Sequence, residues 1–388
     1  MTASPHLRTG PISARLLGAA TMAVVAALAG TAFAGVTATK TTIDPSAPAQ
    51  LRAKGAGDLD GDGRGDLVVG AAGGGIFWYR NGAWLPKRTI SPSVVPAEEI
   101  EVADLTGDGQ RDVLVAVNGG TDWFENGGGG TRWTRRQLQR TETLHDIAVA
   151  DIDGDGKPDV IGRRSYKAST SYGLALRIWR QVSKTSWKLT TINLPQTGTG
   201  LAVARIDSDS KPDIAVGKYW LQNQSTPGVV KLRTHTYNAK AERDAKVVAG
   251  DINGDGRTDL FVTPPHPTIS GTHKVAWYEA PADRTKGWTE HLLEANVQPV
   301  IHSAHIVDLD GDGKKDLVTA MDSLGSDDLP IKIYLNDGDE TFTLRTIAKD
   351  AQHAMQVLTV GGKKALVGAD YNETPRSRVE MWSLTPTP

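Results

Sequence analysis

Asp58-Leu59-Asp60-Gly61-Asp62-Gly63-Arg64-Gly65-Asp66 is the stretch that decides the fold, because close copies of it recur along the 388-residue chain. The close copies begin at Asp104, Asp151, Asp251 and Asp308, and a damaged copy runs from Arg205 to Asp213. A seventh unit, Val360–Gly368, resembles the segment Leu309–Val318 without its acids. Successive copies start roughly 50 residues apart, a period that predicts a repeat architecture.

Each unit contains four short apolar segments in the same order, which we expect to be strands. The first leads into the Asp loop, the second follows it directly, and the third and fourth carry aromatic residues. Examples of the first three are Ile147–Ala150, Asp66–Val69 and Trp277–Glu279, and Trp288 opens a fourth. β-branched and aromatic residues fill these segments, and Gly, Asn and Pro separate them, which is typical of strands and turns.

Four antiparallel strands per repeat describe one blade of a β-propeller. We therefore predict an all-β fold, a seven-bladed β-propeller of four-stranded antiparallel blades that spans residues 35–388 as one domain. The last unit ends at a third strand, Met381–Leu384, so an N-terminal strand near Thr39–Ile43 is expected to complete the last blade. Such closure removes the open strand edges that a linear array of sheets would expose.

The N-terminus has the pattern of a secretion signal. Arg8 and Arg15 form a basic start, Leu16–Gly30 is small and apolar, and Ala32-Phe33-Ala34 is a cleavage pattern. We predict a signal peptide over residues 1–34 and a secreted, extracellular protein; the alternative is an uncleaved membrane anchor. No later stretch is apolar for about 18 residues, so we expect no membrane span after cleavage.

Composition narrows the classes of function. The chain has 43 basic and 45 acidic residues, so we expect no nucleic-acid partner. It has no cysteine, which excludes disulfides and the lipid attachment of a lipoprotein. A secreted protein without disulfides needs another source of stability, and bound metal is one candidate. We expect the protein to be a monomer.

The Asp loops are predicted calcium sites. Ca²⁺ prefers oxygen ligands, and acids at positions 1, 3, 5 and 9 converge if Gly at positions 4 and 6 lets the backbone turn sharply. Position 12 is Val69, not the Glu of an EF-hand, so the loop is EF-hand-like on a β scaffold. We predict about five structural Ca²⁺ sites, with a metal-free Asp-Gly turn as the alternative. The predicted ligands are Asp58, Asp60, Asp62, Asp66, Asp104, Thr106, Asp108, Asp112, Asp151, Asp153, Asp155, Asp159, Asp251, Asn253, Asp255, Asp259, Asp308, Asp310, Asp312 and Asp316.

The damaged fourth loop begins with Arg205 where the other copies have Asp. Asp207, Asp209 and Asp213 remain beside it. Because a guanidinium carries the positive charge that the metal would bring, we expect the Arg205 side chain to occupy the place of the metal.

These loops, the Trp-Tyr third strand and the seven units resemble the FG-GAP/VCBS repeat family, the integrin α-chain type of β-propeller. The resemblance covers residues 39–388, and it is closer to the bacterial VCBS branch because no Phe-Gly…Gly-Ala-Pro signature is intact. It implies a propeller fold and bound calcium. The family includes adhesion domains and lectin-like proteins, and related propellers include polysaccharide lyases.

A functional surface is expected on the face opposite the Asp loops. In an up-and-down blade the 1–2 loops and 3–4 hairpins share one face, and the 2–3 and 4–1 loops share the other. Trp220, Tyr166 and Tyr371 repeat less than the other aromatics, which makes them candidates for ligand contact. Six residues before each Asp loop the chain carries Arg52, Glu98, His145, Thr199, Ala245 and His302. The longest 2–3 loops are Arg163–Lys167, Lys218–Trp220, His266–His273, Asp322–Asp328 and Tyr371–Arg376.

Basic and aromatic side chains on that face would suit an anionic sugar, because Arg pairs with carboxylates. Our leading hypothesis is a non-catalytic recognition module for extracellular glycan. The first alternative is a polysaccharide lyase or a glycoside hydrolase, with His145, His302 and Arg52 as catalytic residues. A protein–protein adhesion module with a cell-surface partner is the second. We find no G-x-S-x-G elbow, H-E-x-x-H motif or phosphate loop.

Overall fold

The computed structural model describes residues 35–164, 175–195, 200–242, 245–264, 272–298, 301–321, 329–350, 352–369 and 377–387. The chain divides into two units, Met1–Phe33 and Ala34–Pro388. The predicted signal peptide lies outside the described residues. So do Tyr166, Thr199 and Tyr371, together with most of the predicted loops at 266–273, 322–328 and 371–376.

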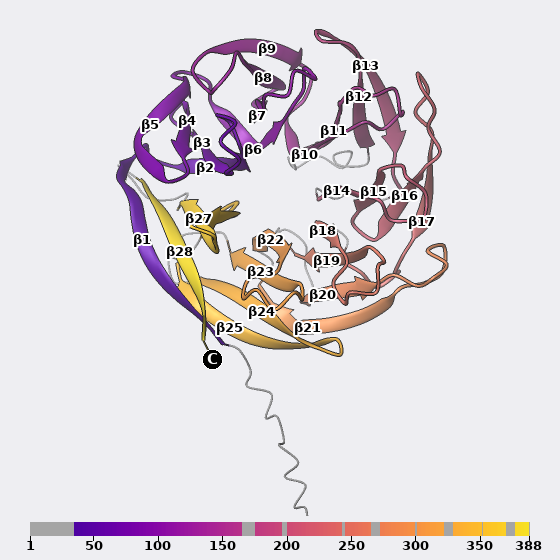
Figure 1. The fold of residues 1–388 in the computed structure, drawn as a ribbon. Coiled ribbons are helices and arrows are strands. Elements are labelled where there is room, and N and C mark those ends of the chain that lie inside the picture. The colour runs from indigo at the N-terminus through magenta and orange to yellow at the C-terminus, as the bar shows by residue number, and fades with distance from the viewer. Residues whose placement is uncertain are drawn as a thin grey trace, which may run out of the picture. The chain divides into compact units, whose positions relative to one another are not determined.

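The described strands form seven four-stranded antiparallel sheets arranged in a ring (Figure 1), which confirms the predicted seven-bladed propeller. In each sheet the first strand lies nearest the centre of the ring, and the fourth is outermost. Blade 1 consists of β2 (Leu51–Gly57), β3 (Asp66–Ala71), β4 (Ile76–Arg80) and β5 (Ala83–Ser91). Blade 2 consists of β6 (Pro96–Ala103), β7 (Asp112–Val117), β8 (Gly120–Asn126) and β9 (Trp133–Gln139). Blade 3 consists of β10 (Leu144–Ala150), β11 (Asp159–Arg164), β12 (Ala175–Ser183) and β13 (Ser186–Asn193).

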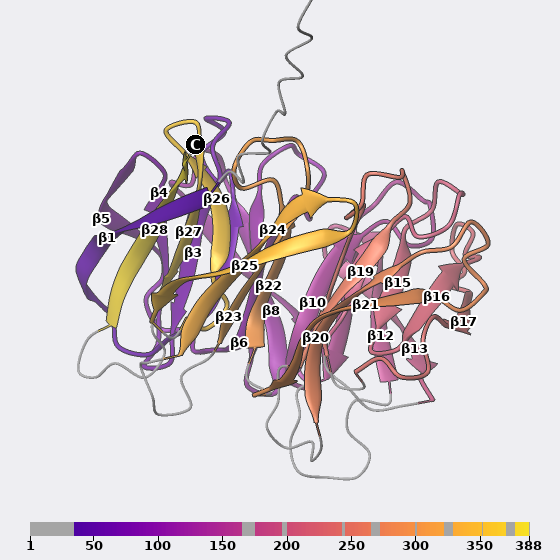
Figure 2. The same cartoon turned by 90° about the horizontal axis from the view of Figure 1, so that it is seen from below.

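The remaining blades repeat this plan, and their sheets stand side by side around the ring (Figure 2). Blade 4 consists of β14 (Ala202–Ala204), β15 (Asp213–Val216), β16 (Tyr219–Asn223) and β17 (Leu232–Thr236). Blade 5 consists of β18 (Lys246–Gly250), β19 (Asp259–Thr263), β20 (His273–Glu279) and β21 (Thr289–Val297). Blade 6 consists of β22 (Ile301–Val307), β23 (Asp316–Met321), β24 (Pro330–Gly338) and β25 (Thr341–Lys349). Blade 7 consists of β26 (Gln356–Val360), β27 (Lys363–Ala369), β28 (Ser377–Thr387) and β1 (Gly35–Ala47).

The two ends of the described chain meet in blade 7. β1 pairs antiparallel with β28, from Gly35 opposite Thr387 to Ala47 opposite Ser377. A cluster of buried residues, among them Ile43, Leu67 and Val379, then joins blade 7 to blade 1. The outermost strand of the last sheet therefore comes from the start of the described chain, and the ring has no gap between its first and last blades.

The core lies between the blades. Seven clusters of buried apolar residues are found in the described part of the chain, and each joins two neighbouring sheets. The third strands supply the largest buried side chains, which are Trp78, Trp123, Trp220, Trp277 and Trp382. Trp220 was predicted as a ligand contact, and that prediction is wrong: the ring is fully buried and its Nε1 donates to the Arg284 carbonyl at 3.2 Å.

Buried amide side chains link five of the seven described sheets to the blade before them, four of them to its Asp loop. We call them the bridging amides: Asn81, Asn126, Gln181, Asn223 and Asn336. Each donates to a backbone carbonyl of the preceding blade, with acceptors Thr359, Leu59, Leu105, Ile152 and Ile252 at 2.8–3.0 Å. In blade 5 the Arg284 guanidinium takes this role and donates to the Ile206 carbonyl at 3.1 Å. The blades are therefore joined by polar contacts as well as by apolar packing.

No helix in the described part of the chain is long and apolar enough to cross a membrane.

Candidate functional site

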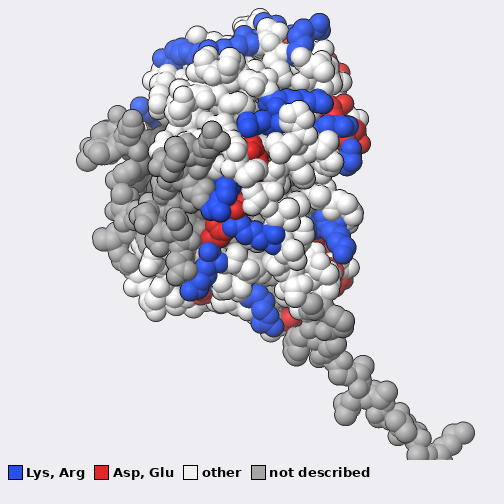
Figure 3. All heavy atoms as spheres, turned by 90° about the vertical axis from the view of Figure 1, so that its left-hand side faces the viewer, with Lys and Arg blue, Asp and Glu red and all other residues white. Residues whose placement is uncertain are grey.

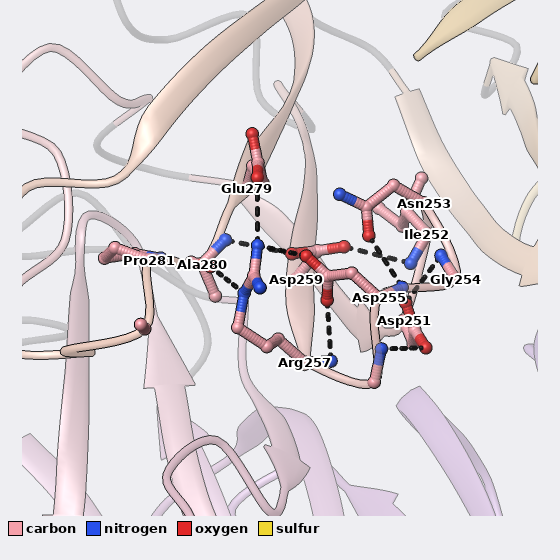
Figure 4. A network of polar contacts seen from close by, with 12 residues as sticks. Asp251, Ile252, Asn253, Gly254, Asp255, Arg257, Asp259, Glu279, Ala280 and Pro281 are labelled. Atoms are coloured by element: carbon pink, nitrogen blue, oxygen red, sulfur yellow. Dashed lines mark hydrogen bonds and ion pairs between the residues drawn. The ribbon is translucent and has the colours of Figure 1, made fainter. Parts of the chain in front are cut away.

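The Asp loop of blade 5 shows how the five intact loops fold (Figure 4). The Asp251 carboxylate accepts hydrogen bonds from the backbone N–H groups of Gly254 at 2.8 Å, Asp255 at 3.1 Å and Gly256 at 2.9 Å. Gly254 and Gly256 have φ values of 80° and 81°, in the left-handed region that glycine enters without steric cost. The loop therefore wraps around its first carboxylate, as the two-glycine pattern predicts.

The last acid of each loop is a structural anchor. In blade 5 one Asp259 oxygen accepts from the Ile252 N–H at 3.0 Å, and the other accepts from the Ala280 N–H at 2.9 Å. Asp259 is fully buried, and this burial raises its pKa to about 6 against the opposing effect of the two backbone hydrogen bonds. The same pair of bonds recurs in blade 1 for Asp66, which accepts from Leu59 and Asn81. This acid fixes the loop to the third strand of its own blade.

Three of the intact loops contain acids close enough together to fit a calcium ion, and in two of them the group includes the anchoring acid. One carboxylate oxygen from each of Asp58, Asp60 and Asp62 lies within 4.8 Å of the other two. Two further groups of three acids meet the same distance limit. Asp60 Oδ1 is buried and has no hydrogen-bond partner, so it has a lone pair available for a cation. Donor sets of oxygen alone suit Ca²⁺. The further groups are Asp151, Asp153 and Asp159, and Asp308, Asp310 and Asp316.

Two of the predicted ligands are not carboxylates. Thr106 and Asn253 stand at the third position of their loops, where their side chains offer a neutral oxygen. The Asn253 oxygen accepts from the Asp255 N–H at 3.2 Å, and the Thr106 hydroxyl donates to Asp104 at 3.4 Å. These two loops keep the fold of the others with less negative charge.

The damaged loop of blade 4 differs from the expectation. Arg205 is exposed, and within the described ranges no ion pair joins its guanidinium to the acids of its own loop, so it does not take the place of a metal. Asp207 instead accepts from the Gln222 amide at 2.8 Å. Ser208 and Ser210 replace the two glycines, and a side chain like Arg205 offers no carboxylate for loop N–H groups. The blade 4 loop therefore lacks both the glycines that permit the sharp turn and the first carboxylate that accepts the loop N–H groups in the intact copies.

The predicted catalytic residues do come together at the starts of the inner strands. We call this group the inner-strand cluster, and it lies at the opposite strand ends from the Asp loops. The His145 and His302 rings have their centroids 6.2 Å apart. Arg52 binds both oxygens of Glu98, at 2.8 and 2.7 Å, and its carbonyl lies 2.7 Å from His353 Nδ1. The members are Arg52, Glu98, Glu99, His145, Asp146, Lys246, His302 and His353.

Charge within the inner-strand cluster is paired. Lys246 binds Asp146 at 2.8 Å and Glu99 at 3.2 Å, and His145 Nδ1 lies 2.5 Å from Asp146. Burial opposes the charge of Asp146, but Lys246 and His145 outweigh it and hold its pKa well below the usual range. Burial also lowers the pKa of His353, so this imidazole is neutral near pH 7. The cluster therefore contains both charged pairs and a neutral histidine.

The inner-strand cluster has little room for a ligand. The cavity that its described residues line has a volume of about 30 Å³, which is space for about one water molecule. Pockets for small molecules usually measure about 300–1,000 Å³. The cluster, as the described residues form it, is a packed polar plug rather than a substrate pocket.

Larger hollows lie beside the Asp loops, between neighbouring blades. The first, which we call the 3/4 groove, has a volume of about 500 Å³ and lies between Asp151–Gly154 of blade 3 and Ser210–Pro212 of blade 4. The second, the 5/6 groove, has a volume of about 340 Å³ and lies between Asp251–Gly254 of blade 5 and Gly313–Lys315 of blade 6. Both are formed by equivalent loop positions, so they are two copies of one feature of the repeat.

The 3/4 groove has a cation that the 5/6 groove lacks at the same place. Arg205 lines the 3/4 groove, and its counterpart in blade 6 is Asp308. Lys211, which also lines the 3/4 groove, donates to the Ser225 carbonyl at 2.8 Å, whereas no ion pair with Arg205 forms among the described residues. The loss of the loop acid has thus placed a guanidinium in a hollow of ligand size.

A comparison with protein-family models matches the FG-GAP-like repeat at residues 58–115, 104–162 and 251–319. The chain contains FG-GAP-like repeats. This confirms the resemblance that the Asp loops predict, and the damaged loop at Arg205 lies outside the matched segments. No curated protein sequence matches the chain significantly.

Solved structures match the propeller of FG-GAP-like repeats at low sequence identity. One is an Agrocybe aegerita lectin described as recognising non-reducing terminal N-acetylglucosamine, at 18% identity and a TM-score of 0.50, covering 76% of this chain and 79% of the lectin. Another is BBS1N, crystallised in complex with ARL6DN and soaked with lead, at 13% identity and a TM-score of 0.55, covering 89% of this chain and 95% of that one. At such identities the likeness shows the fold alone.

The outer surface of the FG-GAP propeller carries bands of Lys and Arg over β1 and β5 (Figure 3). The cations of these strands have partners. Lys87 binds Asp44 at 2.9 Å, Lys40 binds Glu380 at 2.9 Å, and the Arg88 guanidinium stacks 4.6 Å from the centre of the Trp78 ring. The Lys40 and Arg88 contacts lie within one blade, whereas the Lys87–Asp44 pair joins blade 1 to blade 7.

Sequence reasoning missed the grooves and the bridging amides. The signal for the amides was present, because Asn126 and Asn223 are the last residues of their third strands and Asn336 lies two residues before the end of its own. The sequence feature that marks the 3/4 groove is Arg205, which stands where the intact loops have Asp. The groove itself needs two loops of different blades side by side, which no local pattern indicates.

Proposed function

We propose that this propeller is a secreted, calcium-stabilised recognition module that binds carbohydrate in the grooves between its blades. Both groove volumes, about 500 and about 340 Å³, fall in the range that ligand pockets occupy. Their walls combine Asp-loop backbone and polar side chains with apolar residues such as Ile152 and Ile306, and the polar groups suit the many hydroxyl groups of a sugar. The proposal thus moves the binding surface from the face first expected to the face of the Asp loops.

The observation that carries the proposal is Arg205 in the 3/4 groove. A guanidinium without an ion-pair partner among the described residues, in a hollow of this size, suits a carboxylate or sulfate group, which it can bind through two parallel hydrogen bonds. Asp151 and Asp153 on the facing wall would repel an anion, but a calcium ion in their loop would compensate their charge. We therefore propose an acidic glycan as the ligand of the 3/4 groove.

When bound, calcium would supply positive charge and fix the loop walls; Asp151, Asp153 and Asp159 would hold it beside the 3/4 groove. Arg205 would then orient the acidic group of the sugar. In this proposal the Asp loop forms the wall of the groove and Arg205 binds the acidic group. The fold neighbour described as an N-acetylglucosamine-recognising lectin supports a carbohydrate ligand.

The enzyme alternative is less well supported. Proton abstraction by His145 or His302 requires a substrate beside the imidazole, and the cavity at the inner-strand cluster measures about 30 Å³. Arg52, proposed to bind a uronate, is already held by Glu98 through both carboxylate oxygens. Protein–protein adhesion remains the other alternative, with BBS1N as a fold neighbour seen in complex with a protein.

The test is a glycan array that includes uronate-bearing, sulfated and neutral glycans, probed with the purified protein in millimolar calcium. We expect acidic glycans to bind. Arg205→Ala should weaken that binding about tenfold to a hundredfold, because a charge-assisted hydrogen bond contributes roughly 1.5–3 kcal/mol. Arg233→Ala is the matched control, since Arg233 is an exposed Arg of the same blade, on its outer strand and away from the groove.

Three outcomes would overturn the proposal. An array with no bound glycan would contradict carbohydrate recognition. Equal binding by the Arg205 and Arg233 variants would contradict the 3/4 groove as the acidic site. New unsaturated ends on an acidic polysaccharide, detected by ultraviolet absorbance and abolished by His302→Ala, would establish the lyase alternative instead.

A further inference from the structure

We propose that the interface between blades 5 and 6 binds a transition-metal ion of the zinc class through His291, Glu279 and Glu340. Glu279 ends β20, His291 lies on β21, and Glu340 lies in the turn between β24 and β25. One nitrogen of His291 and one oxygen of each glutamate lie within 4.8 Å of one another. The site is separate from the Asp loops and uses a different donor set.

The two glutamates approach opposite edges of the same ring. His291 Nε2 lies 3.2 Å from Glu279 Oε2, and His291 Nδ1 lies 3.6 Å from Glu340 Oε2. One ion takes one of the two nitrogens, so the carboxylate on the other edge has to shift toward it. Glu340 is the side chain free to do so, because it is 44% exposed in a turn, whereas Glu279 is 23% exposed.

The surroundings hold the first two ligands in place. The His291 ring stacks on Trp277 with centroids 4.0 Å apart and an angle of 7° between the planes, since these residues are cross-strand partners. Arg257 binds Glu279 through Oε1 at 3.1 Å, which leaves Oε2 toward His291 (Figure 4 shows this Arg257–Glu279 pair). Such outer contacts fix the orientation of metal ligands and strengthen binding.

The donor set selects the metal. One imidazole and two carboxylates are three protein ligands, the number found in zinc sites that leave one position open. Calcium prefers oxygen ligands alone, so the histidine favours Zn²⁺, Co²⁺ or Ni²⁺ over the ion of the Asp loops. Glu340 also lines the 5/6 groove of about 340 Å³, which gives an ion a route from solvent.

Blade 4 provides a natural comparison. Trp220 and His235 are cross-strand partners there and stack with centroids 4.6 Å apart, as Trp277 and His291 do in blade 5. The position of Glu279 is occupied by Gln222, whose amide oxygen lies 3.3 Å from His235 Nε2. A neutral amide is a poor zinc ligand. Among the described residues, His235 belongs to no cluster of His, Asp and Glu side chains close enough to share a metal ion. His235 is therefore the matched control for His291.

The experiment is isothermal titration of the calcium-loaded, untagged protein with Zn²⁺, followed by the absorption spectrum with Co²⁺. We expect one high-affinity Zn²⁺ per chain and the intense visible bands of four-coordinate Co²⁺. His291→Gln, which keeps a planar side chain against Trp277, and Glu340→Gln should each weaken Zn²⁺ binding at least about tenfold. His235→Gln should leave the affinity unchanged.

Two results would overturn the proposal. The wild-type protein could show no Zn²⁺ binding, in which case His291 acts only as an ion-pair bridge between the blades. Alternatively, the His291 and His235 variants could bind Zn²⁺ equally, which would place the ion elsewhere. Unchanged circular dichroism and thermal unfolding of both variants in calcium exclude misfolding as the cause of a loss.

Discussion

The bridging amide of blade 2 gives a sharp test of how the ring is held together. Asn126 is 1% exposed, and its amide nitrogen donates to the Leu59 carbonyl of blade 1 at 2.8 Å and to the Arg111 carbonyl at 3.1 Å. Its amide oxygen accepts from the N–H groups of Gly128 and Gly130, both at 3.1 Å. Asn126→Ala removes all four hydrogen bonds and leaves four backbone groups without that partner.

The expected loss follows from the number of bonds. A neutral hydrogen bond contributes roughly 1 kcal/mol net, so four contribute about 4 kcal/mol. Water that enters the loop recovers part of this, so we expect the free energy of unfolding to fall by about 3 kcal/mol. At about 2 °C per kcal/mol, the low end for large domains, the thermal midpoint falls by about 6 °C.

The assay is thermal and urea unfolding in millimolar calcium, with Asn118→Ala as the control. Asn118 is exposed between β7 and β8 of the same blade, so its replacement should change stability by less than about 0.5 kcal/mol. If Asn126→Ala unfolds at the same midpoint as Asn118→Ala, the bridging amides do not stabilise the ring and the reasoning fails.

Two further predictions concern a buried histidine and the damaged loop. His305 Nε2 donates to the Met355 carbonyl at 2.7 Å, and burial lowers its pKa to about 4, with the charge of Lys246 contributing. Because this folded pKa lies below the unfolded value of about 6.5, the stability contribution is complete above pH 6.5 and is lost as pH falls toward 4; between pH 7.5 and 5 we expect a loss of about 2 kcal/mol in urea unfolding. His305→Asn should abolish that part of the pH dependence, and an unchanged slope would contradict the assignment. The combined replacement Arg205→Asp, Ser208→Gly and Ser210→Gly rebuilds an intact Asp loop, so calorimetry should count one more bound calcium than in the wild type; an equal count would show that the motif alone does not make the site.

The fold was predictable because its signals are local and repeated. A pair of glycines at fixed positions permits the turn around Asp58 in one unit, and the same pair does so in four others. The aromatic third strand predicted buried rings, and Trp78 and Trp277 are buried. The glycine turn and the aromatic third strand recur from unit to unit, so the number of repeats in the sequence predicted the number of blades.

The misplaced residues depend on neighbours from other blades. Trp220 looked irregular in sequence, but its ring is covered by blade 5, where Arg284 accepts its N–H. Arg205 looked like a substitute for a metal, but its position in a groove depends on Asp151 and Asp153 of the preceding blade. The sequence pattern of a single repeat does not indicate its contacts with neighbouring blades, and for that reason the grooves were not predicted.

The inner-strand cluster was predicted in its position but not in its chemistry. The spacing from each Asp loop placed His145, His302 and Arg52 at one end of the inner strands, and they do lie there. The sequence did not indicate that Lys246 would neutralise Asp146 across the ring. Pairing between strands about 100 residues apart is a property of the closed ring.

The most direct test of this account is the calcium count of the purified protein, measured by titration calorimetry together with thermal unfolding in calcium and in EDTA. Sites with dissociation constants near 10⁻⁴ M each add about 1.4 kcal/mol at millimolar calcium, so five add about 7 kcal/mol. We predict five bound Ca²⁺ per chain and a midpoint about 14 °C lower in EDTA, at about 2 °C per kcal/mol. A protein that binds no Ca²⁺ and unfolds at the same temperature in EDTA would contradict the central claim that the Asp loops are calcium sites that stabilise the ring.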